Sequence, residues 1–235
     1  MTEDLTRYLI SRPVPSDRPL LGLTVLVVED SRFASEALRL MALRSGARLR
    51  RADCLRAAYR HLQTYCPGVV VVDMGLPDGS GADLIRHIRN TLRSAPAIIG
   101  LSGDPALRET ALEAGADGFL AKPLESLVLF QQAILMALPS EARPKVPRTL
   151  PDEVISPDPL ALRDDLSEVV RMLAERPDPE AVGYVGQFLS GLARSTRDAA
   201  LEDVASELRN ALPGAAAISR AAGLVQARLA AGKSF

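Results

Sequence analysis

The chain has 235 residues, a formal net charge of −1 and two cysteines, and 47% of its residues are hydrophobic. This length suffices for two domains, and the aliphatic-rich composition can fill a hydrophobic core. No apolar run reaches the length of about 18 residues that a membrane span needs. The few cysteines and the absence of an apolar N-terminal region favour a soluble protein of the reducing cytoplasm.

Residues 1–20 contain three prolines and are expected to form an extended N-terminal leader. In residues 21–138, short Val, Ile and Leu runs alternate with helical patterns of about 10 to 15 residues, which is typical of βαβ units. Strands are predicted at Leu23–Val28, Ala47–Arg51, Val69–Val72, Ala97–Leu101 and Phe119–Ala121. Helices are predicted at Phe33–Arg44, Leu55–Tyr65, Ala82–Leu92, Pro105–Ala114 and Leu124–Leu138. The pattern predicts an α/β domain with a five-stranded parallel sheet, in which the arginine-rich second strand suits an edge.

A proline-rich linker is predicted over residues 139–159, where six prolines in 21 residues favour an extended spacer without structure of its own. Residues 160–235 then show helical spacing of apolar side chains, which predicts a small all-α bundle serving as an output or interaction domain. Its helices are expected at Leu162–Leu173, Val182–Leu192, Ala200–Leu212 and Ile218–Leu229.

The C-terminal region is acidic. Residues 151–235 contain nine Lys or Arg and thirteen Asp or Glu, a net charge of −4. This balance makes DNA an unlikely partner, because cations that neutralise phosphates dominate such binding. A helix-turn-helix over Asp203–Leu224 would offer only Arg209 and Arg220 for contacts. No histidine follows His87, which excludes phosphotransfer by the bundle and leaves docking or dimerisation open.

Acidic, hydroxyl and basic residues follow the predicted strands of the first domain. Because the carboxyl ends of parallel strands share one crevice, residues far apart in sequence are expected to meet there. These residues are Glu29, Asp30, Asp73, Ser102, Phe119 and Lys122. A carboxylate that accepts a phosphoryl group needs a divalent cation and a fixed ammonium to neutralise the developing charge.

The types of residue suit Mg²⁺, which prefers oxygen ligands. Asp30 and Asp73 are the expected direct ligands, and Glu29 is expected to act through a water. Lys122 suits an oxygen of the acyl phosphate. Individually these residues are ordinary: Glu29 and Asp30 could cap a helix, and Lys122 could be a surface lysine. Their joint placement at strand ends favours a site in which a carboxylate accepts a phosphoryl group.

Other chemistries have little support. Cys54 and Cys66 show no metal-binding or redox spacing and are expected to be small core residues. His61 and His87 fall on predicted helices and are expected at the surface or its boundary. The C-terminal sequence offers no convergent catalytic set.

Residues 22 to 138 resemble the receiver domain of response regulators in bacterial two-component signalling. The motifs that carry the resemblance are Val27–Ser31, Asp73–Gly81, Leu101–Gly103, Gly115–Phe119 and Leu120–Pro123. The resemblance implies a flavodoxin-like fold and a switch rather than an enzyme, with slow self-dephosphorylation. It further implies a histidine kinase or histidine phosphotransfer protein as the phosphodonor.

By this resemblance Asp73 accepts the phosphoryl group, and the backbone carbonyl of Gly75 completes a magnesium site with Glu29, Asp30 and Asp73. Lys122 contacts the phosphoryl group and precedes a cis Pro123. Ser102 turns toward the phosphoryl group as Phe119 moves inward. Ser102 stands where Thr is commoner, and Phe119 where Tyr is common, so this aromatic ring can signal only through packing.

The expected output is a protein-protein contact of the C-terminal bundle with an unidentified output protein; a homodimer is also possible. The face formed by 106–114, Phe119 and 124–138 is expected to repack and to meet either a second receiver or the bundle. The alternative is a phosphorylation-controlled transcription factor with an atypical DNA-binding domain.

Overall fold

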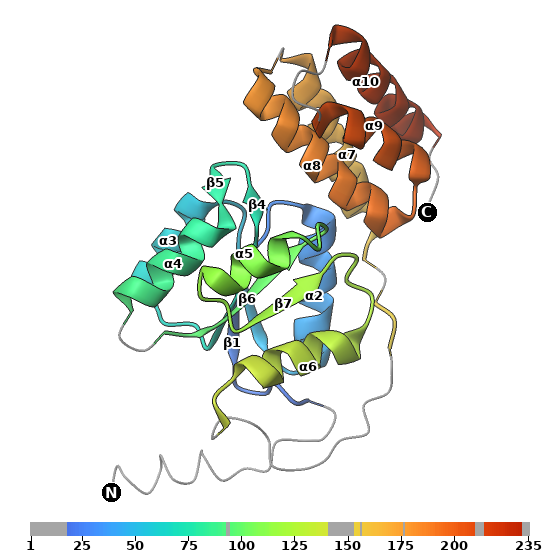
Figure 1. The fold of residues 1–235 in the computed structure, drawn as a ribbon. Helices are drawn as coiled ribbons and strands as arrows, with labels where there is room; N and C mark the ends of the chain where they lie inside the picture. Colours follow the sequence, from blue (N-terminus) through green and yellow to red (C-terminus); the bar gives the residue numbers. More distant parts are fainter. Residues whose placement is uncertain are drawn as a thin grey trace, which may run out of the picture.

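The computed structural model describes residues 18–92, 95–140, 153–155, 157–175, 177–209 and 214–231. Within this part, the chain forms an α/β domain followed by an all-helical bundle (Figure 1). Residues 1–17 of the predicted leader and 141–152 of the predicted linker lie outside the described residues.

The sheet of the first domain has five parallel strands in the order β2-β1-β3-β6-β7. The strands are β1 (Thr24–Val28), β2 (Arg48–Ala52), β3 (Val69–Asp73), β6 (Ala97–Ser102) and β7 (Gly118–Ala121). Strands β3 and β6 are buried along their whole length because helices cover both faces of the sheet, whereas β2 lies at an edge and exposes its arginines. The predicted fold class and edge strand are confirmed.

Two hydrophobic clusters lie on the two faces of the sheet. Helices α2 (Arg32–Arg44) and α6 (Leu127–Ala137) cover one face. Helices α3 (Leu55–Thr64), α4 (Gly81–Thr91) and α5 (Leu107–Glu113) cover the other. The first cluster includes Met41 and Phe130, and the second includes Ala58 and Ile88. This double winding leaves the carboxyl ends of the strands free to carry a site.

Local hydrogen bonds explain where helices begin. Ser31 caps α2, since its hydroxyl accepts from the Ala34 amide at 3.0 Å. Helix α6 begins at Leu127 rather than at the predicted Leu124, because the Ser126 hydroxyl accepts from the Leu129 amide at 3.2 Å. An unpredicted two-stranded hairpin, β4 (Gly75–Leu76) with β5 (Gly79–Ser80), precedes α4.

The C-terminal bundle contains α7 (Pro159–Ala174), α8 (Pro179–Thr196), α9 (Ala199–Arg209) and α10 (Ala215–Ala230). Helices α7 and α8 begin earlier than predicted because Asp158 and Asp178 cap them, each followed by Pro in the first turn. The four helices share a core of their own, which includes Leu166, Leu189 and Val225. No described helix has both the length and the hydropathy required to cross a bilayer.

The residues just before the bundle pack on the first domain. The Leu127 amide donates to the Glu153 carbonyl at 3.2 Å, and the Ile155 amide donates to the Glu125 carbonyl at 2.9 Å. Val154 forms an isolated antiparallel bridge with Ser126, and the Ile155 side chain is 5% exposed within the core under α6. The predicted spacer without structure is therefore wrong at 153–155, where a buried apolar side chain anchors the chain.

Gly81, the first residue of α4, is closely packed against the end of β3. A Cβ at this position would overlap the backbone carbonyl oxygen of Asp73 and lie 2.9 Å from the Met74 Cα. We therefore expect Gly81→Ala to lower the free energy of unfolding by about 2 kcal/mol or more, because neither contact can relax as a side chain can. Urea unfolding tests this, with Gly118→Ala as the control, since a Cβ there meets nothing within 4 Å. Equal losses in the two variants would contradict the packing argument.

Candidate functional site

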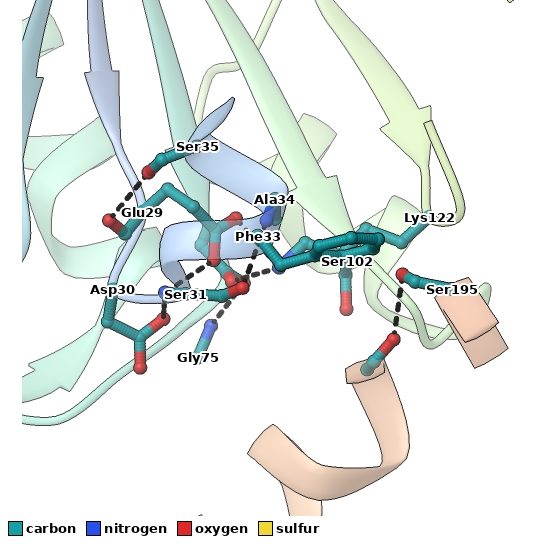
Figure 2. Close-up of polar contacts among 12 residues, drawn as sticks. Glu29, Asp30, Ser31, Phe33, Ala34, Ser35, Gly75, Ser102, Lys122 and Ser195 are labelled. Carbon is teal, nitrogen blue, oxygen red and sulfur yellow. Dashed lines mark hydrogen bonds and ion pairs between the residues drawn. The ribbon is translucent and has the colours of Figure 1, made fainter. Parts of the chain in front are cut away.

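The polar residues predicted to meet do lie together at the carboxyl ends of the strands. Glu29 and Asp30 follow β1, Asp73 ends β3, Ser102 ends β6 and Lys122 follows β7. Figure 2 shows Glu29, Asp30, Gly75, Ser102 and Lys122 gathered at this edge of the sheet. Parallel pairing brings the ends of neighbouring strands to the same height in the sheet. For example, Asp73 of β3 pairs with Leu101 of β6.

Lys122 is held between two carboxylates. Its Nζ lies 2.6 Å from Asp73 Oδ2 and 2.7 Å from Glu29 Oε2, with the lysine side chain 9% exposed. Although burial alone lowers the pKa of Lys122, the charges of Asp73 and Glu29 raise it above its usual range. The ammonium is therefore fixed in its charged form beside Asp73.

The carboxylates carry more negative charge than this single ammonium neutralises. Burial, followed by the charge of Asp73, raises the pKa of Asp30 to about 6. Burial also raises the pKa of Glu29 well above its ordinary value, against the opposing effect of Lys122. Three acids and one base leave an excess of two negative charges when all are ionised.

This cluster suits a divalent cation. Carboxylate oxygens of Glu29, Asp30 and Asp73 all lie within 4.8 Å of one another. Glu29 Oε2 is buried and faces the Lys122 ammonium at 2.7 Å, so one ammonium is shared between Glu29 and Asp73. Hard oxygen ligands and an uncompensated negative charge are what Mg²⁺ requires.

The remaining residues that the sequence predicts for the site differ in how close they lie to Asp73. The Ser102 hydroxyl is buried and accepts from the Asp104 amide at 3.1 Å, at the wall of the cavity that contains Asp73. The Gly75 amide donates to Asp73 Oδ1 at 3.0 Å, which fixes the carboxylate. Phe119 pairs with Gly100 across β6 and β7 and does not line this cavity. The Lys122–Pro123 peptide bond is cis, as the family resemblance implies.

The cavity over Asp73 has a volume of about 250 Å³, and the bundle supplies one of its walls. Helix α8 contributes Gln187, Phe188 and Arg194, and α9 contributes Arg209. Ser195 of α8 also lies near Lys122, with which it lines a neighbouring pocket (Figure 2). The sequence expects the bundle, or a second receiver, to meet the face of 106–114, Phe119 and 124–138. The bundle meets mainly the N-terminus of α2 and the loops after β3 and β6, and it reaches the expected face at Glu125, which pairs with Arg197 of α8.

Sequence reasoning missed the bundle residues that face the site. One signal was available in α7, where Asp165 falls on the apolar stripe of Leu162, Leu166 and Val169. A carboxylate on a buried stripe requires hydrogen-bond partners from another element. No comparable pattern marks Tyr184 or Gln187, whose partners belong to the other domain.

The remaining candidates lie away from this cavity. Cys66 is exposed and Cys54 is half-buried, so the expectation that both are core residues is wrong for Cys66. Cys66 follows Tyr65, at which α3 ends, which leaves its side chain outside the packed face of that helix. His87 is exposed and His61 is half-buried, as predicted.

Comparison with known proteins gives one family. Residues 25–134 match the family model of the response regulator receiver domain. The KDP operon transcriptional regulatory protein KdpE of Escherichia coli is 32% identical over 99 residues, which cover 42% of this chain and 44% of KdpE. The virulence transcriptional regulatory protein PhoP of Salmonella typhimurium is 32% identical over 115 residues, covering 47% of this chain and 51% of PhoP. The chain thus spans about half the length of these curated relatives.

Solved structures with a similar fold include a putative response regulator from Chloroflexus aurantiacus. It is 28% identical, has a TM-score of 0.46, and the match covers 49% of this chain and 97% of that one. The receiver domain of the Pseudomonas aeruginosa sensor histidine kinase PA1611, described with a magnesium ion in its active-site cleft, is 26% identical with a TM-score of 0.44. That match covers 48% of this chain and 94% of that one.

Proposed function

Because residues 25–134 form a response regulator receiver domain, we propose that Asp73 of this chain accepts a phosphoryl group from a histidine kinase or histidine phosphotransfer protein. The observation that carries the proposal is the placement of Asp73 beside a buried, charged Lys122 and within an acidic cluster. A carboxylate so placed is a nucleophile whose negative surroundings a cation can neutralise.

The chemical step is an in-line displacement. An Asp73 carboxylate oxygen forms the new bond to phosphorus as the bond from phosphorus to the donor breaks, and the leaving group keeps the electron pair. Charge on the transferred oxygens is met by the Lys122 ammonium and the Ser102 hydroxyl. Asp73 is held for attack by its contacts with the Gly75 amide and Lys122.

Glu29, Asp30, Asp73 and the Gly75 carbonyl would hold a magnesium ion, which supplies positive charge to the phosphoryl oxygens when bound. Hydrolysis of the resulting acyl phosphate is expected to be slow, as the resemblance to receiver domains implies. Phe119 would then repack over Gly100, where its ring already lies close: a Cβ built on Gly100 is 3.2 Å from the Phe119 ring.

The proposed output is a protein contact controlled by the bundle. The alternative is a phosphorylation-controlled transcription factor. This alternative is supported by the relatives KdpE and PhoP, because both are named as transcriptional regulatory proteins. The expectation that the chain does not bind DNA rests on the net negative charge of residues 151–235. The names of these relatives do not support that expectation. A gel shift of genomic DNA fragments over a range of salt decides between them: salt-sensitive binding by the full chain would favour the alternative.

We expect Lys122→Met to separate phosphorylation from its structural consequence. The variant keeps the carboxylates, so magnesium binding measured by calorimetry should be retained. It loses the ammonium that would contact the phosphoryl group. Hydrogen exchange should show a response to the phosphoryl mimic beryllofluoride in the wild type and none in the variant. Arg86→Met on α4 is the control, because its ion pair with Asp83 is exposed. An unchanged response in Lys122→Met would contradict the role proposed for this lysine.

A further inference from the structure

The bundle is hydrogen-bonded to the helix that begins beside the acidic pair. Asp165 of α7 is 3% exposed, and its carboxylate accepts from the Arg32 amide at 2.9 Å and the Phe33 amide at 3.0 Å. It also accepts from the Ser31 hydroxyl at 2.8 Å. These amides belong to the first turn of α2, whose N–H groups have no partner within the helix. Asp165 therefore caps α2 from the other domain.

Two further bundle residues contact the groups proposed to bind magnesium. The Tyr184 hydroxyl donates to Asp30 Oδ2, while Asp30 Oδ1 accepts from the Ser31 amide at 3.0 Å. The Gln187 amide is pressed against Gly75, where an added Cβ would overlap it. Each hydrogen bond that Asp30 accepts leaves one fewer oxygen lone pair for a cation and lowers the negative charge that the cation meets.

Contacts at the edges complete the interface. Arg194 donates to the carbonyl of Gly103, next to Ser102. Arg32 pairs with Asp164 at 2.7 Å, and Arg197 pairs with Glu125 at 2.7 Å. The Phe33 ring packs on the hydrophobic cluster of the bundle. The polar contacts and the Phe33 anchor together make this a specific docked state.

We propose that Asp165, Tyr184, Gln187 and Arg194 form an internal ligand of the phosphoacceptor site, which competes with magnesium and leaves when the site is loaded. This inference rests on the proposed function of Asp73. Gln187 is exposed, so the cavity stays open to small molecules, whereas a histidine carried on a protein surface must displace α8 to reach Asp73. The bundle thus covers the surface that a protein phosphodonor needs.

A reversible cross-link between the domains tests the competition. A Cβ built on Gly103 lies 3.9 Å from the Cα of Gly191 in α8, so the two positions adjoin across the interface and are candidates for an engineered disulfide. The full chain would carry Gly103→Cys and Gly191→Cys, with Cys54→Ser and Cys66→Ser to remove the native thiols. The reduced form of the same protein is the reference, so a folding defect would appear in both forms.

We expect the oxidised form to bind magnesium at least tenfold more weakly than the reduced form in calorimetry, and to be labelled by acetyl phosphate correspondingly more slowly. Equal magnesium affinities in the two forms would overturn the proposal. If neither form binds magnesium or is labelled, the proposed function of Asp73 itself fails, which is a different result.

Tyr184→Phe isolates the contact with Asp30. Removing one hydrogen bond to a charged group should tighten magnesium binding by about tenfold, because the carboxylate oxygen is freed. Tyr59→Phe is the matched control, since Tyr59 lies on α3 with its ring against His87. Hydrogen exchange supplies a readout apart from binding: magnesium with beryllofluoride should release the Arg32 and Phe33 amides. Continued protection of both amides, with magnesium affinity unchanged in Tyr184→Phe, would refute the competition.

Discussion

The Asp73→Asn variant is expected to take up no phosphoryl group from acetyl phosphate, so that labelling of the full chain falls to background. An amide oxygen is a poor nucleophile and cannot form a stable acyl phosphate, whereas the Asp73 carboxylate lies 2.6 Å from the Lys122 ammonium. Asn is close in shape to Asp, so the fold should persist. Phosphate incorporation measured by intact-protein mass spectrometry, with excess magnesium, reports the result directly.

The control for this variant is Asp83→Asn. Asp83 lies on the exposed surface of α4, in the same domain, and pairs with Arg86. Its removal should leave labelling unchanged, because Asp83 does not line the cavity. If Asp73→Asn were labelled as fully as Asp83→Asn, the phosphoryl group would belong on another residue.

The Asp30→Asn variant is expected to lose magnesium binding and yet be more stable than the wild type without metal, by about 1 to 2 kcal/mol at pH 7. Burial and the nearby Asp73 raise the pKa of Asp30 from 3.8 to about 6. The folded protein therefore binds this proton more tightly than the unfolded chain does. Above the folded-state pKa the carboxylate is ionised in an unfavourable place, and Asn removes that charge.

The sign of the pH dependence follows from the same shift. Since the folded state holds more protons between about pH 4 and pH 6, the contribution of Asp30 to stability falls as pH rises through this interval. Thermal unfolding of metal-free wild type and variant across that range should show the curves separating as pH increases. Magnesium should raise the unfolding temperature of the wild type alone. A variant that is less stable than wild type at pH 7 would contradict the burial argument.

The sequence was sufficient to predict the receiver fold, because its strands and helices are set by local periodicity. The Val69–Asp73 run is apolar on both sides, and Arg48–Ala52 is polar, which places one strand in the centre and the other at an edge. The joint location of Glu29, Asp73 and Lys122 also follows from topology, since parallel strands end at one edge. These features need no knowledge of side-chain packing.

The placement of the bundle could not be predicted in this way. Its contacts depend on single residues, such as Tyr184 with Asp30, that carry no repeating signal. The carboxylate of Asp165 on its apolar stripe indicates that a partner is needed, but not that the partner is the first turn of α2. Apolar periodicity predicts which face of each helix is buried within the bundle, but a docking surface made of polar residues looks like any solvated surface. The roles of Ser102 and Phe119 remain predictions for a similar reason, because they concern a second state of the site.

The anchoring of Glu153–Ile155 under α6 changes how far the bundle can travel. Only residues 156–158 separate the buried Ile155 from Pro159, where α7 begins. The sequence between these two packed points is therefore three residues long, although the proline-rich segment covers 21 residues. A tether this short keeps the effective concentration of the bundle near its docking surface at about millimolar or above. A bundle displaced from Asp73 would therefore stay close to its docking surface and return quickly, so the switch should reset as soon as its ligand departs.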